Sequence, residues 1–352
     1  MTAIRNTTWT SVALGLVLIA SSGQKAHAQD SQLTQFYAAA THLNPAFAGG
    51  TLENRFSFHY RNQWPGIPGR FVSYGASYDV FIPKINSGIG IVFSSDEAGT
   101  GGLGTSSFGF QYSYEVPLGE RLSFRPGLQL GWSSRGLLNW NDLVFGDQIN
   151  RGTAGSGATG SLEGLQNFQL VRNYFDVAAG GVIYSKRFWL GMSSRHLNSP
   201  SESLTDATTA PVPIWFSAHT GVRIPYVSGP TGADQDFLVV ASYRSQGAFD
   251  QMDFGFSIDS PFLTYGVSYR QILMKSAPDG APNHDAISLL LGLTEENFRV
   301  GYSYDITVST LGWGISDGAH QITLIPVRRT PRHFRGRPHR ILRCADVFAD
   351  WL

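Results

Sequence analysis

The sequence predicts an all-β protein, a transmembrane antiparallel β-barrel of about 14 strands with both termini in the periplasm. Two segments show the pattern most clearly, with aromatic or branched residues at every second position from Phe108 to Val116 and from Phe298 to Ile306. Polar residues or glycine lie between them, so each segment has one apolar and one polar face when it is extended. Connections that alternate between short and long favour a closed barrel in an outer membrane.

Composition supports the same class. Of the 352 residues, 42% are hydrophobic and only 15% are charged, whereas soluble domains carry about 25% charged residues. Low charge suits a wall that faces lipid outside and small polar groups inside. The formal net charge of zero gives no global field that would favour nucleic acid. The single cysteine, Cys344, excludes an intramolecular disulfide and a multi-cysteine metal site.

Residues 1–28 have the pattern of a cleaved secretory signal. Arg5 precedes an apolar run at residues 11–20, and Ala26-His27-Ala28 fits a signal-peptidase site. The run is too short to span a bilayer. We therefore expect export, cleavage before Gln29, and a periplasmic or lumenal N-terminal segment over residues 29–52.

The barrel is expected over residues 53–327. Its strands are predicted at residues 53–62, 69–82, 85–96, 104–118, 121–135, 173–185, 187–197, 212–226, 234–245, 250–259, 262–272, 285–294, 297–307 and 318–327. Tight connections follow strands 2, 4, 6, 10 and 12, and outer-membrane barrels place short turns in the periplasm. Both termini are therefore expected there. Soluble sandwiches are the alternative, but they would carry more charge on the polar faces than these strands have.

Several charged residues fall on the polar faces. We expect them to form a lattice that fixes a plug or narrows the bore, although a selectivity filter would need the same residues. The arginines are Arg55, Arg61, Arg125 and Arg135, and the acids are Glu53, Asp79, Glu115 and Asp305. A bore of 14 strands is wider than the side chains of the wall fill, so we expect either a plug or a function for the open lumen.

No motif predicts a catalytic, cofactor or metal site. The G-x-G-x-x-G spacing from Gly155 to Gly160 has no strand before it and no helix after it, so it does not form a phosphate cradle. His196 and the pair His284-Asp285 are the only candidates for a catalytic base near a rim, and neither shows a three-group arrangement. The protein is therefore predicted not to be an enzyme.

Residues 328–352 form a basic tail that we expect in the periplasm. Its arginines, the candidate partner contacts, are Arg328, Arg329, Arg332, Arg335, Arg337, Arg340 and Arg343. Apolar residues such as Phe334 and Trp351 accompany them, which favours docking to a partner. A solvated charge run and binding to lipid headgroups or peptidoglycan are the alternatives.

A series of short motifs, in order, resembles the PorP/SprF family of outer-membrane proteins. The family-motif positions are Asn44, Pro45, Gly49, Arg61, Asn62, Gln63, Trp64, Gly146, Asp147 and Gln148. Further matching strings run from Tyr174 to Gly180, from His196 to Asn198 and from Gly301 to Asp305.

The resemblance implies a non-enzymatic component of the type IX secretion and gliding machinery of Bacteroidota. It implies two kinds of partner, a periplasmic ring and secreted adhesin cargo with a C-terminal sorting domain, beside the outer-membrane lipid that the barrel pattern already predicts. It implies no cofactor. A diffusion channel for small or hydrophobic solutes remains the alternative function.

Overall fold

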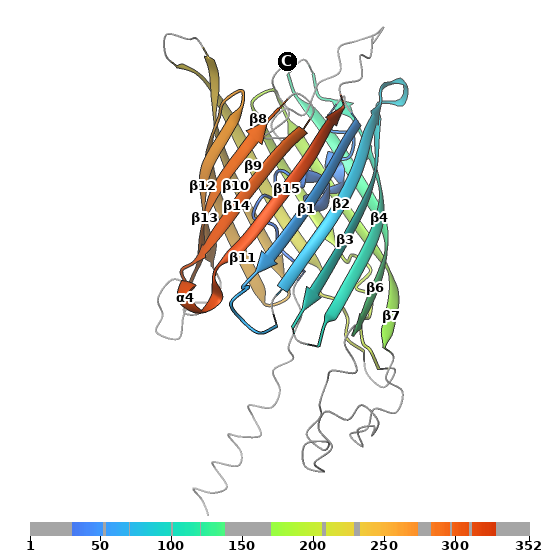
Figure 1. The fold of residues 1–352 in the computed structure, drawn as a ribbon. Coiled ribbons are helices and arrows are strands. Elements are labelled where there is room, and N and C mark those ends of the chain that lie inside the picture. Colours follow the sequence, from blue (N-terminus) through green and yellow to red (C-terminus); the bar gives the residue numbers. More distant parts are fainter. Residues whose placement is uncertain are drawn as a thin grey trace, which may run out of the picture.

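A computed structural model describes residues 30–51, 54–69, 71–99, 101–119, 121–137, 170–205, 209–228, 233–273, 283–295, 298–309 and 312–328. These residues form a closed antiparallel β-barrel, which confirms the predicted fold class (Figure 1). Several predicted features lie outside the described residues. They are the signal, the family-motif positions Gly146, Asp147 and Gln148, the 155–160 motif and the arginines after Arg328.

Each strand pairs with its neighbours along the chain, and β1 pairs with β15 to close the wall. The strands are β1 (Asn54–Gln63), β2 (Phe71–Ile82), β3 (Ser87–Ala98), β4 (Leu103–Tyr114), β5 (Val116–Pro117), β6 (Ser123–Leu137), β7 (Val171–Tyr184), β8 (Phe188–Arg195), β9 (Trp215–Ser228), β10 (Ala233–Gln246), β11 (Phe249–Asp259), β12 (Leu263–Ile272), β13 (Asn283–Thr294), β14 (Phe298–Thr307) and β15 (Ala319–Arg328). Because β4 and β5 both pair with β6 and are separated only by Glu115, they act as one strand of the wall. The barrel therefore has the predicted 14 strands.

The two faces of the wall are the reverse of those of a soluble protein. Along β4 the outward side chains Phe108, Phe110 and Tyr112 are exposed, while the inward Gln111 and Ser113 are buried. Apolar groups on the outside match a lipid environment. No helix in the described ranges is long and apolar enough to cross a membrane.

The barrel has a turn end and a loop end. At the turn end, uppermost in Figure 1, short connections join β2 to β3, β7 to β8 and β11 to β12, and the chain leaves β15 at Arg328. At the loop end lie the longer connections from β6 to β7, β8 to β9 and β14 to β15. The 3-10 helix η3 (Pro83–Ile85) forms one of the short turns, and helix α4 (Trp313–Ser316) lies in one of the longer connections.

Residues 30–51 run along the bore from the loop end to the turn end (Figure 1). Asp30 contacts His196 and Gln246 at the loop end, and Gly49 contacts Asp79 at the turn end. Asp30 and Arg328 therefore lie at opposite ends of the barrel. Connection lengths could not reveal this path, because they locate only the start of β1 and do not constrain the segment before it. The two termini themselves lie outside the described residues.

Candidate functional site: a plugged lumen

The feature of this barrel that bears on function is the lumenal plug, residues 30–51. It contains helix α2 (Ala40–Leu43) and the 3-10 helix η2 (Pro45–Phe47). The plug brings Phe36, Leu43 and Phe47 into a buried cluster with inward side chains of the wall. The wall members of this cluster include Val182, Tyr184, Trp189, Trp215, Leu238, Val240 and Ile325. The plug thus supplies the apolar core that the lumen of an outer-membrane barrel otherwise lacks.

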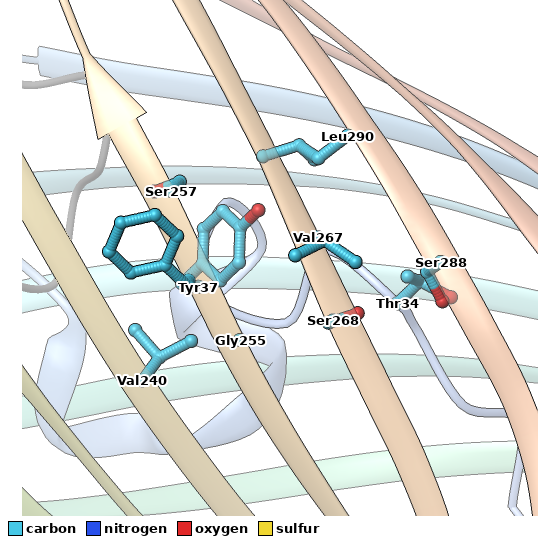
Figure 2. Close-up of a pocket in the computed structure, with 10 residues that line it drawn as sticks. Thr34, Tyr37, Val240, Gly255, Ser257, Val267, Ser268, Ser288 and Leu290 are labelled. Atoms are coloured by element: carbon cyan, nitrogen blue, oxygen red, sulfur yellow. The ribbon is translucent and has the colours of Figure 1, made fainter.

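Tyr37 packs beside the inner surface of β10 to β13 (Figure 2). A cavity of about 20 Å³ remains between it and residues that include Val240, Ser257 and Leu290. Such a space holds about one water molecule. The plug therefore leaves little empty volume along this part of the wall.

At the turn end the plug is held by buried ions. Asp79 accepts hydrogen bonds from the Gly49 N–H at 2.8 Å and from Arg55 Nε at 2.8 Å. Arg125 donates to the carbonyls of Ala48 at 3.2 Å and Gly49 at 2.6 Å, and pairs with Glu115 at 3.2 Å. These contacts bind the plug backbone itself, so they fix its position whatever its side chains are.

In the middle of the bore, Asn44 joins the plug to the wall. Its side chain caps η2 by accepting from the Ala46 N–H at 2.9 Å, and it donates to the carbonyls of Met192 at 3.0 Å and Gly181 at 3.3 Å. Ser193 donates to the Leu43 carbonyl at 2.7 Å. An asparagine suits this position because it can accept and donate at the same time.

Inward glycines give the plug room. A Cβ atom at Gly88 would lie 2.0 Å from the Ala48 carbonyl oxygen, and one at Gly127 would lie 2.3 Å from the Ala46 nitrogen. Within the plug, Gly49 has φ +61°, and a Cβ there would lie 2.6 Å from the Gly88 Cα. The close approach of plug and wall therefore requires glycine on both sides.

Nearer the loop end, Thr34 lies in a charged network. Its hydroxyl donates to Asp305 at 2.6 Å and accepts from Arg61 at 2.6 Å, and its N–H donates to Gln321 at 2.7 Å. Arg61 also pairs with Asp305 at 2.8 Å. The network joins the plug to β1, β14 and β15, on both sides of the seam where the barrel closes.

The loop-end latch is the cluster of Asp30, Asp176, Arg195, His196 and Gln246. His196 donates to Asp30 at 2.9 Å and to Asp176 at 3.0 Å. Burial lowers the pKa of His196, but the two carboxylates outweigh burial and raise the pKa to about 10. Burial raises the pKa of Asp30, but the charges of His196 and Arg195 outweigh it and hold that pKa well below its usual range. The latch is therefore a set of four charged side chains and one amide that meet at Asp30.

Six residues of the predicted lumenal lattice form three ion pairs: Arg55 with Asp79, Arg61 with Asp305, and Arg125 with Glu115. Arg135 instead pairs with Glu202, in the connection after β8, at 2.8 Å. Glu53 lies outside the described residues.

The family-motif residues fall into two groups. Asn44, Pro45 and Gly49 belong to the plug, and Arg61 binds it. Asn62, Gln63 and Trp64 lie at the loop end of β1, where the Trp64 N–H donates to the Gly318 carbonyl at 2.8 Å. The first group is thus explained by the plug. Of the second group, Asn62 and Gln63 pair within the wall, and Trp64 joins two neighbouring connections.

The candidate histidines do not form a catalytic set. Both ring nitrogens of His196 face carboxylates, so neither is placed to take a proton from a serine. His284 contacts the Tyr269 hydroxyl, while its neighbour Asp285 lies 3.7 Å from Arg270. Within the described ranges, no group of three His, Cys, Asp or Glu side chains could hold a metal ion.

Sequence reasoning missed Asp30, Thr34 and Gln321 as binding residues of the plug. One signal was present, because residues 36–40 are largely apolar in a segment that precedes the first strand. The partners could not be deduced in this way, since Thr34 and Gln321 lie at opposite ends of the sequence.

Comparison with known proteins identifies a family. The family model described as "Type IX secretion system membrane protein PorP/SprF" matches residues 25–325. No curated protein matches the chain.

Solved structures with low sequence identity also match. The outer membrane protein Omp33 of Acinetobacter baumannii is 8% identical over 80% of this chain and 100% of its own, with a TM-score of 0.38. A deltaS2 mutant of the monoaromatic hydrocarbon channel TodX is 12% identical over 83% of this chain and 94% of its own, with a TM-score of 0.40. A mutant of the Rh. blastica porin is 9% identical over 78% of this chain and 99% of its own, with a TM-score of 0.32.

Proposed function

The chain belongs to the type IX secretion system membrane protein family PorP/SprF, and on that premise we propose that it supports export and surface display of cargo with a C-terminal sorting domain. In this proposal the barrel lies in the outer membrane, contacts secreted adhesins at its loop end and contacts the periplasmic ring at its turn end. The family and the barrel fold are both of non-enzymatic kinds.

The observation that carries this proposal is the plug. Ion pairs and backbone hydrogen bonds hold it along the bore, from Asp30 at one rim to Gly49 near the other. A bore filled in this way leaves no path for a folded cargo chain. We infer that the barrel works through its two ends and acts as a mount for partners.

The alternative, a diffusion channel for small or hydrophobic solutes, requires an open bore. The buried core between plug and wall argues against it. We therefore do not favour this function.

The tail is proposed to dock on the periplasmic ring, through Arg328, Arg329, Arg332, Arg335, Arg337, Arg340 and Arg343. β15 ends at the turn end, so the tail starts at the side that we assign to the periplasm. Several arginines with apolar neighbours suit an acidic partner surface.

Two tests separate the parts of the proposal. Cells without this protein should fail to display the dependent cargo, and the wild-type chain should restore display; normal display without the protein would contradict the export role.

A chain without residues 329–352 should still form a heat-modifiable barrel and should co-purify less ring protein. Glutamine at Arg329, Arg332 and Arg335 should give a smaller loss of the same kind. Unchanged co-purification would contradict the docking role of the tail alone.

A further inference from the structure

At the loop end, β7 extends further than its neighbour β8. β7 pairs with β6 along its whole length, from Tyr184 to Val171. It pairs with β8 only from Tyr184 to Ala179. The part of β7 from Val171 to Ala178 therefore has a strand on one side only, among the residues that the structure describes.

β8 ends early because the chain turns at His196. This residue has φ +57°, in the left-handed region, and its side chain is held inside the barrel by Asp30 and Asp176. Left-handed backbone interrupts a strand. The turn that belongs to the latch thus also leaves this edge of β7 without a second strand within the described part of the chain.

The part of this edge that lies nearest to β8 is covered by the chain that follows β8. The Leu197 N–H donates to the Val177 carbonyl at 3.0 Å. The Asn198 side chain accepts from the Val177 N–H at 3.1 Å and donates to the Phe175 carbonyl at 2.7 Å. The Asn198 side chain thus bonds backbone groups that a neighbouring strand would otherwise bond, and it reaches no further than Phe175.

Beyond Asn198, toward the loop end, the edge has a regular row of backbone groups. In an antiparallel pair alternate residues direct their backbone groups to alternate sides, so Phe175, Asn173 and Val171 share the orientation of Val177, away from β6. The row consists of the Phe175 N–H and the N–H and C=O groups of Asn173 and Val171. None of these has a hydrogen-bond partner among the described residues on that side.

The row begins at the membrane interface and continues beyond it toward the loop end. Phe108, Trp132 and Phe175 are adjacent in register on the outer face, with exposed fractions of 52%, 56% and 46%. Aromatic residues gather where lipid meets water. Two residues further toward the loop end, the outward positions Ser106, Ser134 and Asn173 are polar, and they also lie side by side in register. Open strand edges do not occur in the hydrocarbon region, so this edge faces the aqueous side.

We propose that the edge of β7 from Val171 to Phe175 is where secreted cargo docks, by adding an extended segment to the barrel wall as a further strand. This inference rests on the proposed function and names the contact through which the loop end would hold cargo. The row offers donors and acceptors in the order that an extended polypeptide matches, and lipid acyl chains offer neither. Side chains of the added strand would meet Val171, which is 53% exposed, and Phe175 on the outer face.

The test compares two substitutions at one position. Asn173→Pro removes an N–H that points away from β6, and proline is tolerated at an edge of this kind. Asn173→Ala keeps that N–H and serves as the matched control. Binding of purified full-length protein in detergent to the purified C-terminal sorting domain of a dependent cargo is measured, with heat-modifiability as the check that each variant folds.

We expect the alanine variant to bind like wild type and the proline variant to bind about tenfold more weakly or worse. Equal binding by all three proteins would overturn docking at this edge and leave the proposed function intact. Failure of the wild type to bind the domain would count against the proposed function itself.

Hydrogen exchange supplies a second measurement that does not depend on the proline variant. The amides of Asn173 and Phe175 should exchange quickly in the free protein and slowly when the sorting domain is bound. Slow exchange without the domain would mean that another part of this chain, or a second copy, already covers the edge, and the inference would be wrong.

Discussion

The two ends of the plug are held in different ways. At the turn end, Asp79 and Arg125 are 0% and 1% exposed, and they bind the plug backbone. At the loop end, the side chains of Asp30 and Arg195 are 25% and 26% exposed, so water reaches the plug's side of the contact, while His196 and Asp176 on the wall side are buried. A charge that loses its partner in a buried site costs far more than one near solvent. The plug is thus fixed near β1 and held more weakly at the Asp30 end.

Breaking the turn-end ion pair should have the largest effect. Asp79→Ala removes the carboxylate that binds Arg55 and the Gly49 N–H, and loss of one partner of a buried pair costs about 3–5 kcal/mol. Urea unfolding followed by heat-modifiability measures the loss. Asp30→Ala, which breaks the pair at the other end, should cost about 1 kcal/mol. Equal losses would remove the contrast between the two ends.

Crowding the turn end should have the next largest effect. Gly49→Ala places a Cβ 2.6 Å from the Gly88 Cα and 2.9 Å from the Val80 carbonyl oxygen, at φ +61°. Overpacking of this kind costs about 1–3 kcal/mol. Thermal unfolding of the barrel is the measurement. Gly314→Ala is the control, because a Cβ there meets no atom within 4 Å. A Gly49 variant as stable as this control would contradict the close packing of plug and wall.

The loop-end latch should depend on pH. The pKa of His196 is raised to about 10, so its contribution to stability is complete below the unfolded pKa of about 6.5 and is lost as pH rises toward 10. The pKa of Asp30 is lowered, so its contribution is present above about 3.9 and is lost as pH falls below that value. His196→Gln should therefore lower the free energy of unfolding by about 1.5–3 kcal/mol at pH 6, the range for a hydrogen bond to a charged group, and by much less at pH 10.5. The same difference at both pH values would show that His196 acts without its charge.

The smallest effect on stability, but the clearest on topology, is expected at Ser31. It is exposed next to the latch, so Ser31→Cys should not disturb the fold. In a Cys344→Ser background, a membrane-impermeant maleimide should label position 31 in intact cells. Leu118→Cys, exposed at the turn end, should be labelled only after the outer membrane is permeabilised. The reverse pattern would place the loop end in the periplasm.

The barrel could be predicted because its signals are local. Alternation in β4 and β14 and the lengths of the connections fix strand positions to within three residues of the observed bounds. The charge lattice was predictable in part, since arginines on an inward face need carboxylates nearby. The pairing of Arg135 with Glu202 was not, because Glu202 lies in a connection without periodicity.

The path of the plug could not be predicted. Residues 30–51 form no long element whose period would reveal a buried face, and their partners come from strands throughout the wall. The Asn44 side chain illustrates this: it reaches Gly181 and Met192, more than a hundred residues away. Contacts of this kind arise only once the wall has closed around the segment.

Single-channel conductance in planar bilayers tests the central claim, that residues 30–51 close the bore. The purified wild-type protein should give no steady current, because the plug is held at both rims and along its length. A chain without residues 30–46, with β1 and its lead-in from Phe47 intact, should give steady openings if it folds as a heat-modifiable barrel. Large, steady openings from the wild-type protein would contradict the claim and would favour a diffusion channel.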